Sequence, residues 1–378
     1  MTPGTEHWLP AMRRRQRPVE NALGTRQVMI AICNRFESSS PASADEKRAL
    51  IENWTRAFSQ FRDEFPDGQD IAPKHTVFLP VEDAESNWMS SLGNVCETAG
   101  NEIEFLAPRT VQSADRFREI ILRGKEILSE HGWLSRDETG AIRYGLIHNG
   151  SAERSAPLVP HAEVLRGTGC YASFLWQSDP NHIPPEYENS LCYFHEGEAA
   201  SPRRGLRRVR AERGTRSECE EDILVVPPPH ARDRDRKKFG LLPHFETGEL
   251  SAAEPPSRDR LRLWLDCRIT VEARPNWVFI TLHIDGSRPE NSRMLLGEPM
   301  RKFYRTLAEL SERDRSLRFH CVTARELVNI LHAAEAGHSG NPLQFREFRY
   351  LAPAALARES SEESAQSLSN RSDAIHIH

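Results

Sequence analysis

The sequence predicts an α/β fold, namely a single (β/α) barrel of about seven units that is distorted or incompletely closed. Short apolar runs alternate along the chain with longer amphipathic stretches of helical period. Strands separated by helices of this length are parallel and joined by crossover connections. About seven such units fit within residues 26–350, which suits a barrel. An open doubly wound sheet is the alternative, but no G-x-G-x-x-G sequence stands at a strand-to-helix turn to support it.

The expected strands are short runs of apolar and β-branched residues that end in polar turns. In chain order they lie at 28–33, 75–80, 103–106, 144–148, 171–176, 191–194, 223–226, 277–283 and 318–322. The first of them, 28–33 (VMIAIC), opens the alternation, and 277–283 (WVFITLH) has the strongest strand character.

The expected helices are stretches whose apolar residues recur at a spacing of three and four. In chain order they lie at 45–65, 88–98, 113–131, around 161–167, at 299–313 and from 324 onward. Trp54, Phe58 and Phe61 belong to the apolar side of the first helix. Thr323 and Glu326 form an S/T-x-x-E capping box, which indicates where the last helix begins.

The two ends of the chain differ in composition from the barrel domain at 26–350. Residues 1–25 carry positive charge without the apolar core of a secretory signal, and we expect a flexible arm. Residues 351–378 are polar and rich in Ser, and we expect a disordered tail.

A charged insertion at 196–238 interrupts the barrel pattern. It holds seven Arg residues between Arg203 and Arg216, then an acidic cluster and a second charged loop at 230–238. The insertion is either a solvated excursion whose charges neutralise each other or a basic lip for a polyanion.

Composition excludes several classes of protein. The net charge of −5 argues against a chain designed as a whole for nucleic acid. No run approaches the roughly 18 apolar residues of a membrane span. The seven cysteines are dispersed and odd in number, which favours a reducing compartment, and the cytoplasm is the expected location.

Candidate functional residues follow the strands, because chemistry in barrels gathers where strands lead into helices. The catalytic candidates are His283, Asp285, His148 and Glu82, and the substrate-binding candidates are Asn34, Arg109, Asn149 and Arg325. Two histidines and several carboxylates on one edge are able to bind a divalent metal or to act as acid and base. Each residue also has a structural interpretation: a strand-end His is often hydrogen-bonded, and an acid before a helix stabilises the helix dipole.

Several long segments resemble the polysaccharide deacetylase superfamily. They are WVFITLHIDGSRPENSRMLLGEPMRKFYRTL, LRFHCVTARELVNILHAAEAG, HTVFLPVED, LSRDETGAIRYGLIHNG, VLRGTGCYASF and KKFGLLPHFETGEL. The resemblance covers about residues 26–350 and implies the glycoside hydrolase/deacetylase β/α barrel. It also implies hydrolysis of acetyl groups on glycans by a divalent metal held by one Asp and two His, with a second Asp as base and a His as acid.

The sequence departs from that family pattern at the metal site. The first strand of the family ends on an aspartate, where this chain has Asn34, and the His-rich stretch after the third strand is replaced around Arg109. Only His283 stands where the family's L-x-H motif implies it, and His148 matches a strand-end His of the close relatives. We therefore expect no metal at the usual site, since an amide is a poor ligand and Arg109 adds a cation.

These observations leave three hypotheses for function and leave open whether the protein is an enzyme. The first is a catalytically disabled barrel of exopolysaccharide metabolism that retains a cleft for a carbohydrate or acidic glycan, without a cofactor. The second is an active carbohydrate hydrolase or deacetylase with a rearranged site, with or without a displaced divalent metal. The third is a polyanion binder that uses the stretch from Arg203 to Arg216. The sequence favours no oligomeric state.

Overall fold

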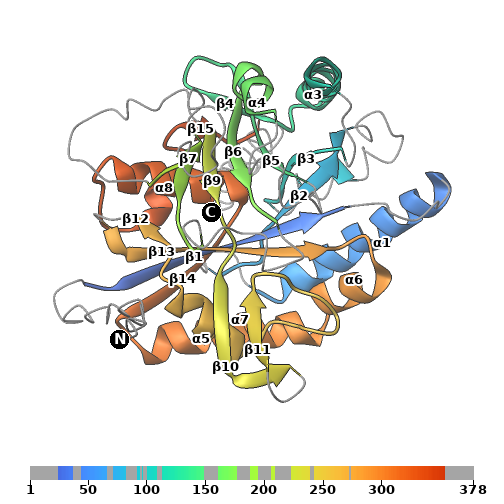
Figure 1. Cartoon of the computed structure of the whole chain (residues 1–378). Helices are drawn as coiled ribbons and strands as arrows, with labels where there is room; N and C mark the ends of the chain where they lie inside the picture. The colour runs from blue at the N-terminus through green and yellow to red at the C-terminus, as the bar shows by residue number, and fades with distance from the viewer. Residues whose placement is uncertain are drawn as a thin grey trace, which may run out of the picture.

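The computed structural model describes most of the region expected to form the barrel. The described residues are 24–36, 44–65, 71–81, 92–93, 96, 100–108, 113–148, 161–176, 188–194, 206–208, 223–238, 242–271 and 274–353. They form a mixed α/β architecture, with a mostly parallel central sheet and helices packed around it (Figure 1).

The central sheet places its parallel strands in the order β13-β1-β2-β3-β5-β6-β9. Their bounds are β1 (Arg26–Arg35), β2 (His75–Pro80), β3 (Glu102–Leu106), β5 (Ile142–Ile147), β6 (Cys170–Phe174), β9 (Ile223–Val226) and β13 (Arg274–Asp285). A further parallel strand, β14 (Leu317–Val322), pairs with the first half of β1, whereas β2 pairs with its last four residues. Short antiparallel strands extend the sheet: β4 (Ser135–Asp137), β7 (Cys192–Phe194), β8 (Leu206–Arg208), β12 (Thr270–Val271) and β15 (Tyr350–Leu351).

The expected barrel does not close through a continuous ladder. The outermost parallel strands, β9 and β13, share no strand pairing among the described residues. Residues 248–250 bridge part of the gap: the N–H of Leu250 donates to the carbonyl of His283 at 2.7 Å, and the N–H of His283 donates to the carbonyl of Gly248 at 2.8 Å. The Thr281 hydroxyl also donates to the carbonyl of Pro227, directly after β9, at 3.2 Å. A Cβ on Gly248 would lie 2.6 Å from the Thr281 carbonyl oxygen, so only glycine fits this approach.

Helices pack on the outer side of the sheet, and one helix packs on its inner side. The outer helices are α1 (Ala44–Asp63), α3 (Ala114–Glu130), α4 (Ala162–Thr168), α5 (Arg258–Asp266), α6 (Pro289–Leu295) and α7 (Glu298–Arg313). The inner helix is α8 (Ala324–Glu335), and the 3-10 helix η4 (Pro342–Phe345) lies against it. The bounds of α1, α3 and α7 agree with the expected helices to within two residues.

The amphipathic period decides which residues face each side. On β1, Val28, Ile30 and Ile32 belong to the outer core, which contains side chains of α1, α5, α6 and α7. Met29, Ala31 and Cys33 alternate with them and belong to the inner core, together with apolar residues of α8. The even and odd positions of β1 thus separate an outer layer from the interior of the incomplete barrel.

Helix α8 begins where the capping box predicts, and this prediction is confirmed. The hydroxyl of Thr323 accepts the Glu326 N–H at 3.2 Å, and the Glu326 carboxylate accepts the Thr323 N–H at 3.0 Å. Every residue from Ala324 to Ala334 is buried, and the Ala324 N–H donates to the Thr76 hydroxyl at 2.7 Å. The helix therefore lies inside the sheet, close to the beginning of β2, rather than on the outer surface.

The expectation of a loop at 230–238 is wrong. This segment is strand β10 (His230–Lys238), which pairs antiparallel with β11 (Leu242–Thr247) as a separate hairpin (Figure 1). Arg260 of α5 holds the hairpin, because it donates to both carboxylate oxygens of Glu246 at 2.8 and 2.6 Å. The strand was not predicted because its residues are mostly Arg, Asp and Lys, and strands were identified from runs of apolar residues.

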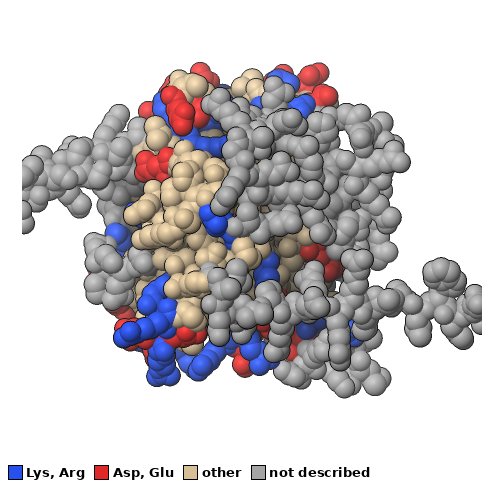
Figure 2. Space-filling view, turned by 90° about the vertical axis from the view of Figure 1, so that its left-hand side faces the viewer, with Lys and Arg blue, Asp and Glu red and all other residues tan. Residues whose placement is uncertain are grey.

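The segment at 196–238, expected to be a charged insertion outside the barrel, contributes strands to the sheet. Within it, β9 pairs with β6 in the buried sheet, and β8 pairs with β7. The remainder of the stretch from Arg203 to Arg216 lies outside the described residues, as do 1–23, 354–378 and most of the helix expected at 88–98. On the face seen in Figure 2, the described Lys and Arg side chains gather mostly at the top and bottom and stand among Asp and Glu.

Among the described helices, none has both the length and the apolar character needed to cross a bilayer.

Candidate functional site

The strand registers align the inward-facing side chains in two rows, which lie near the carboxyl ends of β13 and β1 and in the first half or the middle of β2 and β3. The row nearer the carboxyl ends is Asp285, Arg35, Phe78 and Glu104, and the next is His283, Cys33, Thr76 and Glu102. Each row runs across β13, β1, β2 and β3. In β/α barrels, binding sites are usually built from polar and ionisable side chains at the carboxyl ends of the strands.

Arg35 and Trp176 contact each other across the interior. The Cζ atom of Arg35 lies 3.3 Å from the centroid of the Trp176 ring. Arg35 ends β1, whereas Trp176 follows β6, and β2, β3 and β5 separate these two strands in the sheet. Arg35 is 2% exposed, so the stack is largely desolvated and contributes about 2 kcal/mol of cation–π attraction.

His283 lies next to this stack and is neutral. Burial lowers its pKa to about 3, and the positive charge of Arg35 adds to the shift. Neither ring nitrogen has a hydrogen-bond partner, and both are buried. The Nε1 atom of Trp176 is likewise buried without a partner. Buried polar atoms are nearly always paired, so these groups point to a ligand or water that would complete them.

Asp285 stands in register with Arg35, but its carboxylate is engaged elsewhere. It accepts the N–H and hydroxyl of Ser287 at 3.2 and 2.5 Å and the Arg288 Nε–H at 2.9 Å. Glu249, the other acid near Arg35, is partly exposed. Burial raises the pKa of Glu249, and the charges of Arg35 and Arg288 oppose that rise.

Asn34 points away from the inner row and fixes the turn after β13. Its Oδ1 accepts the Gly286 N–H at 3.0 Å, while its Nδ2 is buried without a partner. A Cβ on Gly286 would lie 2.1 Å from that oxygen, which explains the glycine. Asn34 was expected to face the binding site at the end of β1, but the residue that faces the inner side there is Arg35.

Glu104 is a buried acid on the inner side that sequence reasoning missed. It accepts the Tyr171 hydroxyl and, at 2.5 Å, the Gly145 N–H. Burial raises the pKa of Glu104 to about 8, against these two hydrogen bonds. The sequence did contain a sign of this: in 102–106 (EIEFL) the two acids alternate with apolar residues, so Glu102 and Glu104 lie on the same side of the strand.

Arg325 does not join the other candidates. It lies in the first turn of α8 and donates to both oxygens of Glu102, at the beginning of β3. Its remaining bonds go to the carbonyls of Arg346 and Tyr350. The side chain is 2% exposed, so it serves as a structural cation that holds the first residue of β3.

His148 lies on the other side of the sheet from His283. It follows Ile147, an inner-core residue, and is close enough to His161 for that ring to contribute to its pKa. His161 packs on Phe117 of α3, with ring centroids 5.1 Å apart, in the outer layer. Burial is the main cause of the lowered pKa of His148, about 3. The expected convergence of the two histidines is therefore wrong, because adjacent strand positions face opposite ways.

Glu82, Arg109 and Asn149 lie outside the described residues, as do the loops that contain them. Among the residues with described side chains, no group of three or more His, Cys, Asp or Glu is able to hold a metal ion. The described inner side chains fit a divalent cation poorly, since the Arg35 guanidinium would repel it in a desolvated setting.

Arg35 and Trp176 were not singled out from the sequence, although Arg35 stands two positions after Cys33 and shares its side of β1.

No protein-family model and no curated protein matches the chain. The chain is similar in structure to a proposed polysaccharide deacetylase from Mycobacterium smegmatis, at 13% identity and a TM-score of 0.40, over 79% of this chain and 94% of that one. An alpha-mannosidase from Enterococcus faecalis V583 matches at 10% identity and a TM-score of 0.43, over 81% of this chain and 29% of that one. The PuuE allantoinase matches at 13% identity and a TM-score of 0.42, over 85% and 96% of the two chains. At these TM-scores the likeness adds no argument, and the architecture rests on the strand pairing described above.

Proposed function

We propose that the protein is a polysaccharide-deacetylase-like barrel that binds a carbohydrate at the carboxyl ends of its strands and lacks metal-dependent deacetylase activity. The observation that carries the proposal is the group formed by Arg35, Trp176 and His283. It combines an aromatic ring, a buried cation and unpartnered polar atoms. Sugar-binding sites use this combination, because a sugar presents both apolar C–H faces and hydroxyl groups.

The loss of metal-dependent activity is argued from charge. A metal-assisted hydrolase needs anionic or imidazole ligands around the ion. The end of β1 instead presents the guanidinium of Arg35 to the interior, and Asn34 bonds to the turn at Gly286. A cation held in the place of a metal ligand weakens binding of a divalent ion by Coulomb repulsion.

Calorimetric titration with a trimer of N-acetylglucosamine tests the binding proposal. We expect measurable binding by the full chain, and a loss of roughly tenfold or more in Trp176→Ala, as for aromatic anchors in general. Arg116→Ala, on the outer helix α3, is the control and should bind as the parent does. Absence of binding to neutral and acidic oligosaccharides alike would refute the proposal.

Acetate release tests the second part. Incubation of the protein with an acetylated oligosaccharide and added zinc should release no acetate above the level of zinc alone. Zinc-dependent release, abolished by a chelator, would refute the loss of metal-dependent activity.

A metal-free carbohydrate hydrolase is the second candidate. Glu104, with a pKa of about 8, and neutral His283 give the inner side two groups whose pKa values have moved in opposite directions. Such pairs are typical of acid–base sites. Acetate release that persists in a chelator and disappears in Glu104→Gln would favour this candidate over the first.

A further inference from the structure

We infer that the carbohydrate site continues from the group around Trp176 and His283 to a second sugar-binding position at the base of the hairpin of β10 and β11. Glu188, His230 and Phe245 form this second position. The inference rests on the proposed function and specifies the class of ligand, which is an oligosaccharide that spans both positions rather than a single sugar.

The end of β11 shows which side of the hairpin continues the inner side of the barrel. Glu246 is bonded to the outer helix α5, so Thr247, the next residue of the strand, faces the opposite side. Two residues further on, Glu249 pairs with His283, which faces the inner side, and Leu250 belongs to the outer core. Thr247 and Glu249 therefore both face inward.

His230 faces the same side, because it lies directly opposite Thr247 in the hairpin. The segment 247–250 stands between His230 and His283, which gives two strand spacings between the two histidines. With about 5 Å for each spacing, their backbones are on the order of 10 Å apart. The second position therefore adjoins the first at the open side of the barrel, between β9 and β13.

Glu188 orients the imidazole of His230 as a hydrogen-bond acceptor. The Nδ1 atom of His230 lies 3.1 Å from Oε1 of Glu188, and a carboxylate only accepts, so Nδ1 carries the proton and Nε2 of the neutral ring is the acceptor. That Nε2 atom is buried without a partner. Asn189 holds the backbone of His230 at both ends, since its Nδ2 donates to the carbonyl at 2.7 Å and its Oδ1 accepts the N–H at 2.8 Å. The acceptor is fixed in place and lacks only a donor.

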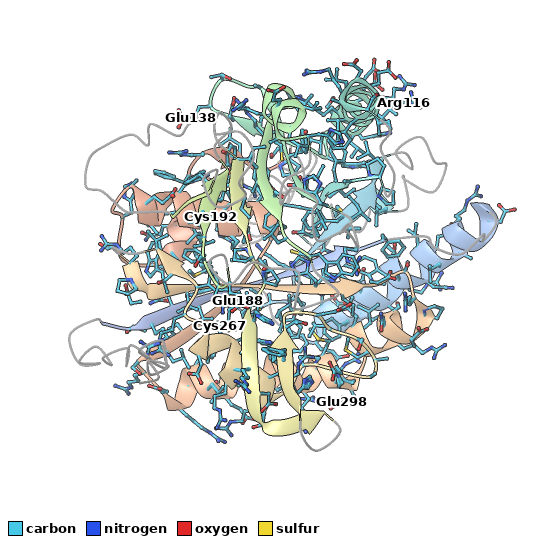
Figure 3. All side chains as sticks on the ribbon, in the orientation of Figure 1. Arg116, Glu138, Glu188, Cys192, Cys267 and Glu298 are labelled. Atoms are coloured by element: carbon cyan, nitrogen blue, oxygen red, sulfur yellow. The ribbon has the colours of Figure 1, made fainter. Side chains whose placement is uncertain are left out.

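Phe245 supplies an apolar face beside this acceptor. Its ring stacks on the ring of His230, with centroids 5.2 Å apart and planes at 13°, and 37% of the residue is exposed. The side chain of Glu188 is 35% exposed, and it lies at the base of the hairpin, away from Arg116 on α3 (Figure 3). The two polar groups both accept, so the ligand must present donors next to an apolar surface. A sugar does so, with its hydroxyl groups and its C–H face.

The affinity of the full chain for N-acetylglucosamine and for its tetramer tests the inference. A single sugar cannot contact both positions at once, whereas the tetramer is long enough to do so. Nuclear magnetic resonance titration measures the single sugar, and calorimetry measures the tetramer. The variants are Phe245→Thr, which suits a strand, and His230→Phe, which keeps the stacked ring and removes Nε2.

The controls are Leu122→Ala and Glu119→Gln, both at exposed positions of α3. Circular dichroism and thermal melting establish that each variant is folded. Phe245→Thr changes a partly exposed side chain, so it tests the position even if His230→Phe does not fold.

We expect the parent to bind the tetramer roughly a hundredfold more tightly than the single sugar, because the linked ligand occupies both positions at once. Phe245→Thr and His230→Phe should each reduce this ratio roughly tenfold, as loss of an aromatic or buried polar contact does. The two controls should keep the ratio of the parent.

A ratio near one in the parent would overturn the inference, as would a ratio that folded Phe245→Thr or His230→Phe leaves at the parent's value. In either case, binding that depends on Trp176 would leave the proposed function standing. Failure of both the single sugar and the tetramer to bind would refute the proposed function and this inference together.

Discussion

Arg325 and Glu102 form a fully buried, two-oxygen ion pair that ties the first turn of α8 to the first residue of β3. The Arg325 Nε–H lies 3.1 Å from each carboxylate oxygen of Glu102, and the Nη2 atom lies 2.7 Å from one of them. Burial by itself would lower the pKa of Arg325, but the charge and hydrogen bonds of Glu102 raise it above its usual value. The Arg325 guanidinium therefore keeps its charge inside the protein.

Arg325→Met should destabilise the protein strongly. The substitution leaves Glu102 as a buried charge without its partner, which costs about 3–5 kcal/mol of unfolding free energy. Arg305→Met is the matched control, because Arg305 pairs with Glu298 on the surface and such pairs contribute about 1 kcal/mol or less. Urea denaturation at pH 7 measures both. If the two substitutions lowered the unfolding free energy by similar amounts, burial of the Arg325–Glu102 pair would not increase its contribution to stability.

Glu104 should make stability fall as pH rises. Its pKa is raised from 4.5 to about 8, so the folded protein keeps the proton over a range in which the unfolded chain has lost it. Its contribution is complete below pH 4.5 and is lost as pH rises towards 8. Between pH 4.5 and 7 the loss is on the order of 3 kcal/mol.

Glu104→Gln tests this dependence, because the amide resembles the protonated acid and does not ionise. We expect the variant to gain stability relative to the parent as pH rises from 5 to 8. Glu119→Gln, at an exposed position of α3, should follow the parent at every pH. Parallel curves for the parent and Glu104→Gln would mean that the buried acid does not titrate in this range.

His75 should act in the opposite direction, at acid pH. Its ring lies against Phe58 and Trp54, with centroids 4.9 and 6.1 Å away, and both ring nitrogens are buried without partners. Burial lowers its pKa from 6.5 to about 3. The unfolded chain therefore takes up the proton first, and stability is lost as pH falls through this window.

His75→Phe removes the titrating group and keeps an aromatic ring in contact with Phe58. At pH 5 the variant should be more stable relative to the parent than at pH 7.5, by on the order of 2 kcal/mol. Guanidinium denaturation at the two pH values gives the difference. A stability difference that is independent of pH would contradict the assignment of His75 as a buried neutral group.

Asn34→Asp should not create a metal site, although it restores the carboxylate that the resembled family carries after its first strand. The side chain bonds to Gly286 and its Nδ2 lacks an acceptor, so the variant places a charge in a buried position. We expect a loss of about 1–3 kcal/mol in thermal or urea unfolding at pH 7. Elemental analysis should detect no zinc. Stoichiometric zinc together with acetate release would contradict the outward orientation of position 34.

Hydrophobic periodicity predicted most of the fold, because buried positions are occupied by apolar residues at a spacing that differs between strands and helices. The parallel strands at 28–33, 75–80 and 277–283 are apolar on both sides, as strands between two packed layers must be. The capping box at Thr323 is purely local, so it was readable without tertiary information. The hairpin of β10 and β11 was missed because its alternating charges give no hydrophobic signal.

The site was predicted less well, because position at the end of a strand does not reveal which way a side chain points. His283 lies on the inner side, whereas His148 and Asn34 lie on the other, and Arg325 is occupied by an ion pair with Glu102. The alternation of β1 would have selected Arg35 instead of Asn34, had the period of two been followed one residue further.

By itself, the sequence determined which segments form strands and helices and that these strands are mostly parallel, since both follow from local patterns of apolar residues. Only the tertiary structure decided that the barrel stays open between β9 and β13, that α8 lies inside it, and that Arg35 stacks on Trp176. These are contacts between residues far apart in the chain. Their free energy depends on register and on which side of a strand each residue faces, and no local pattern specifies the partner.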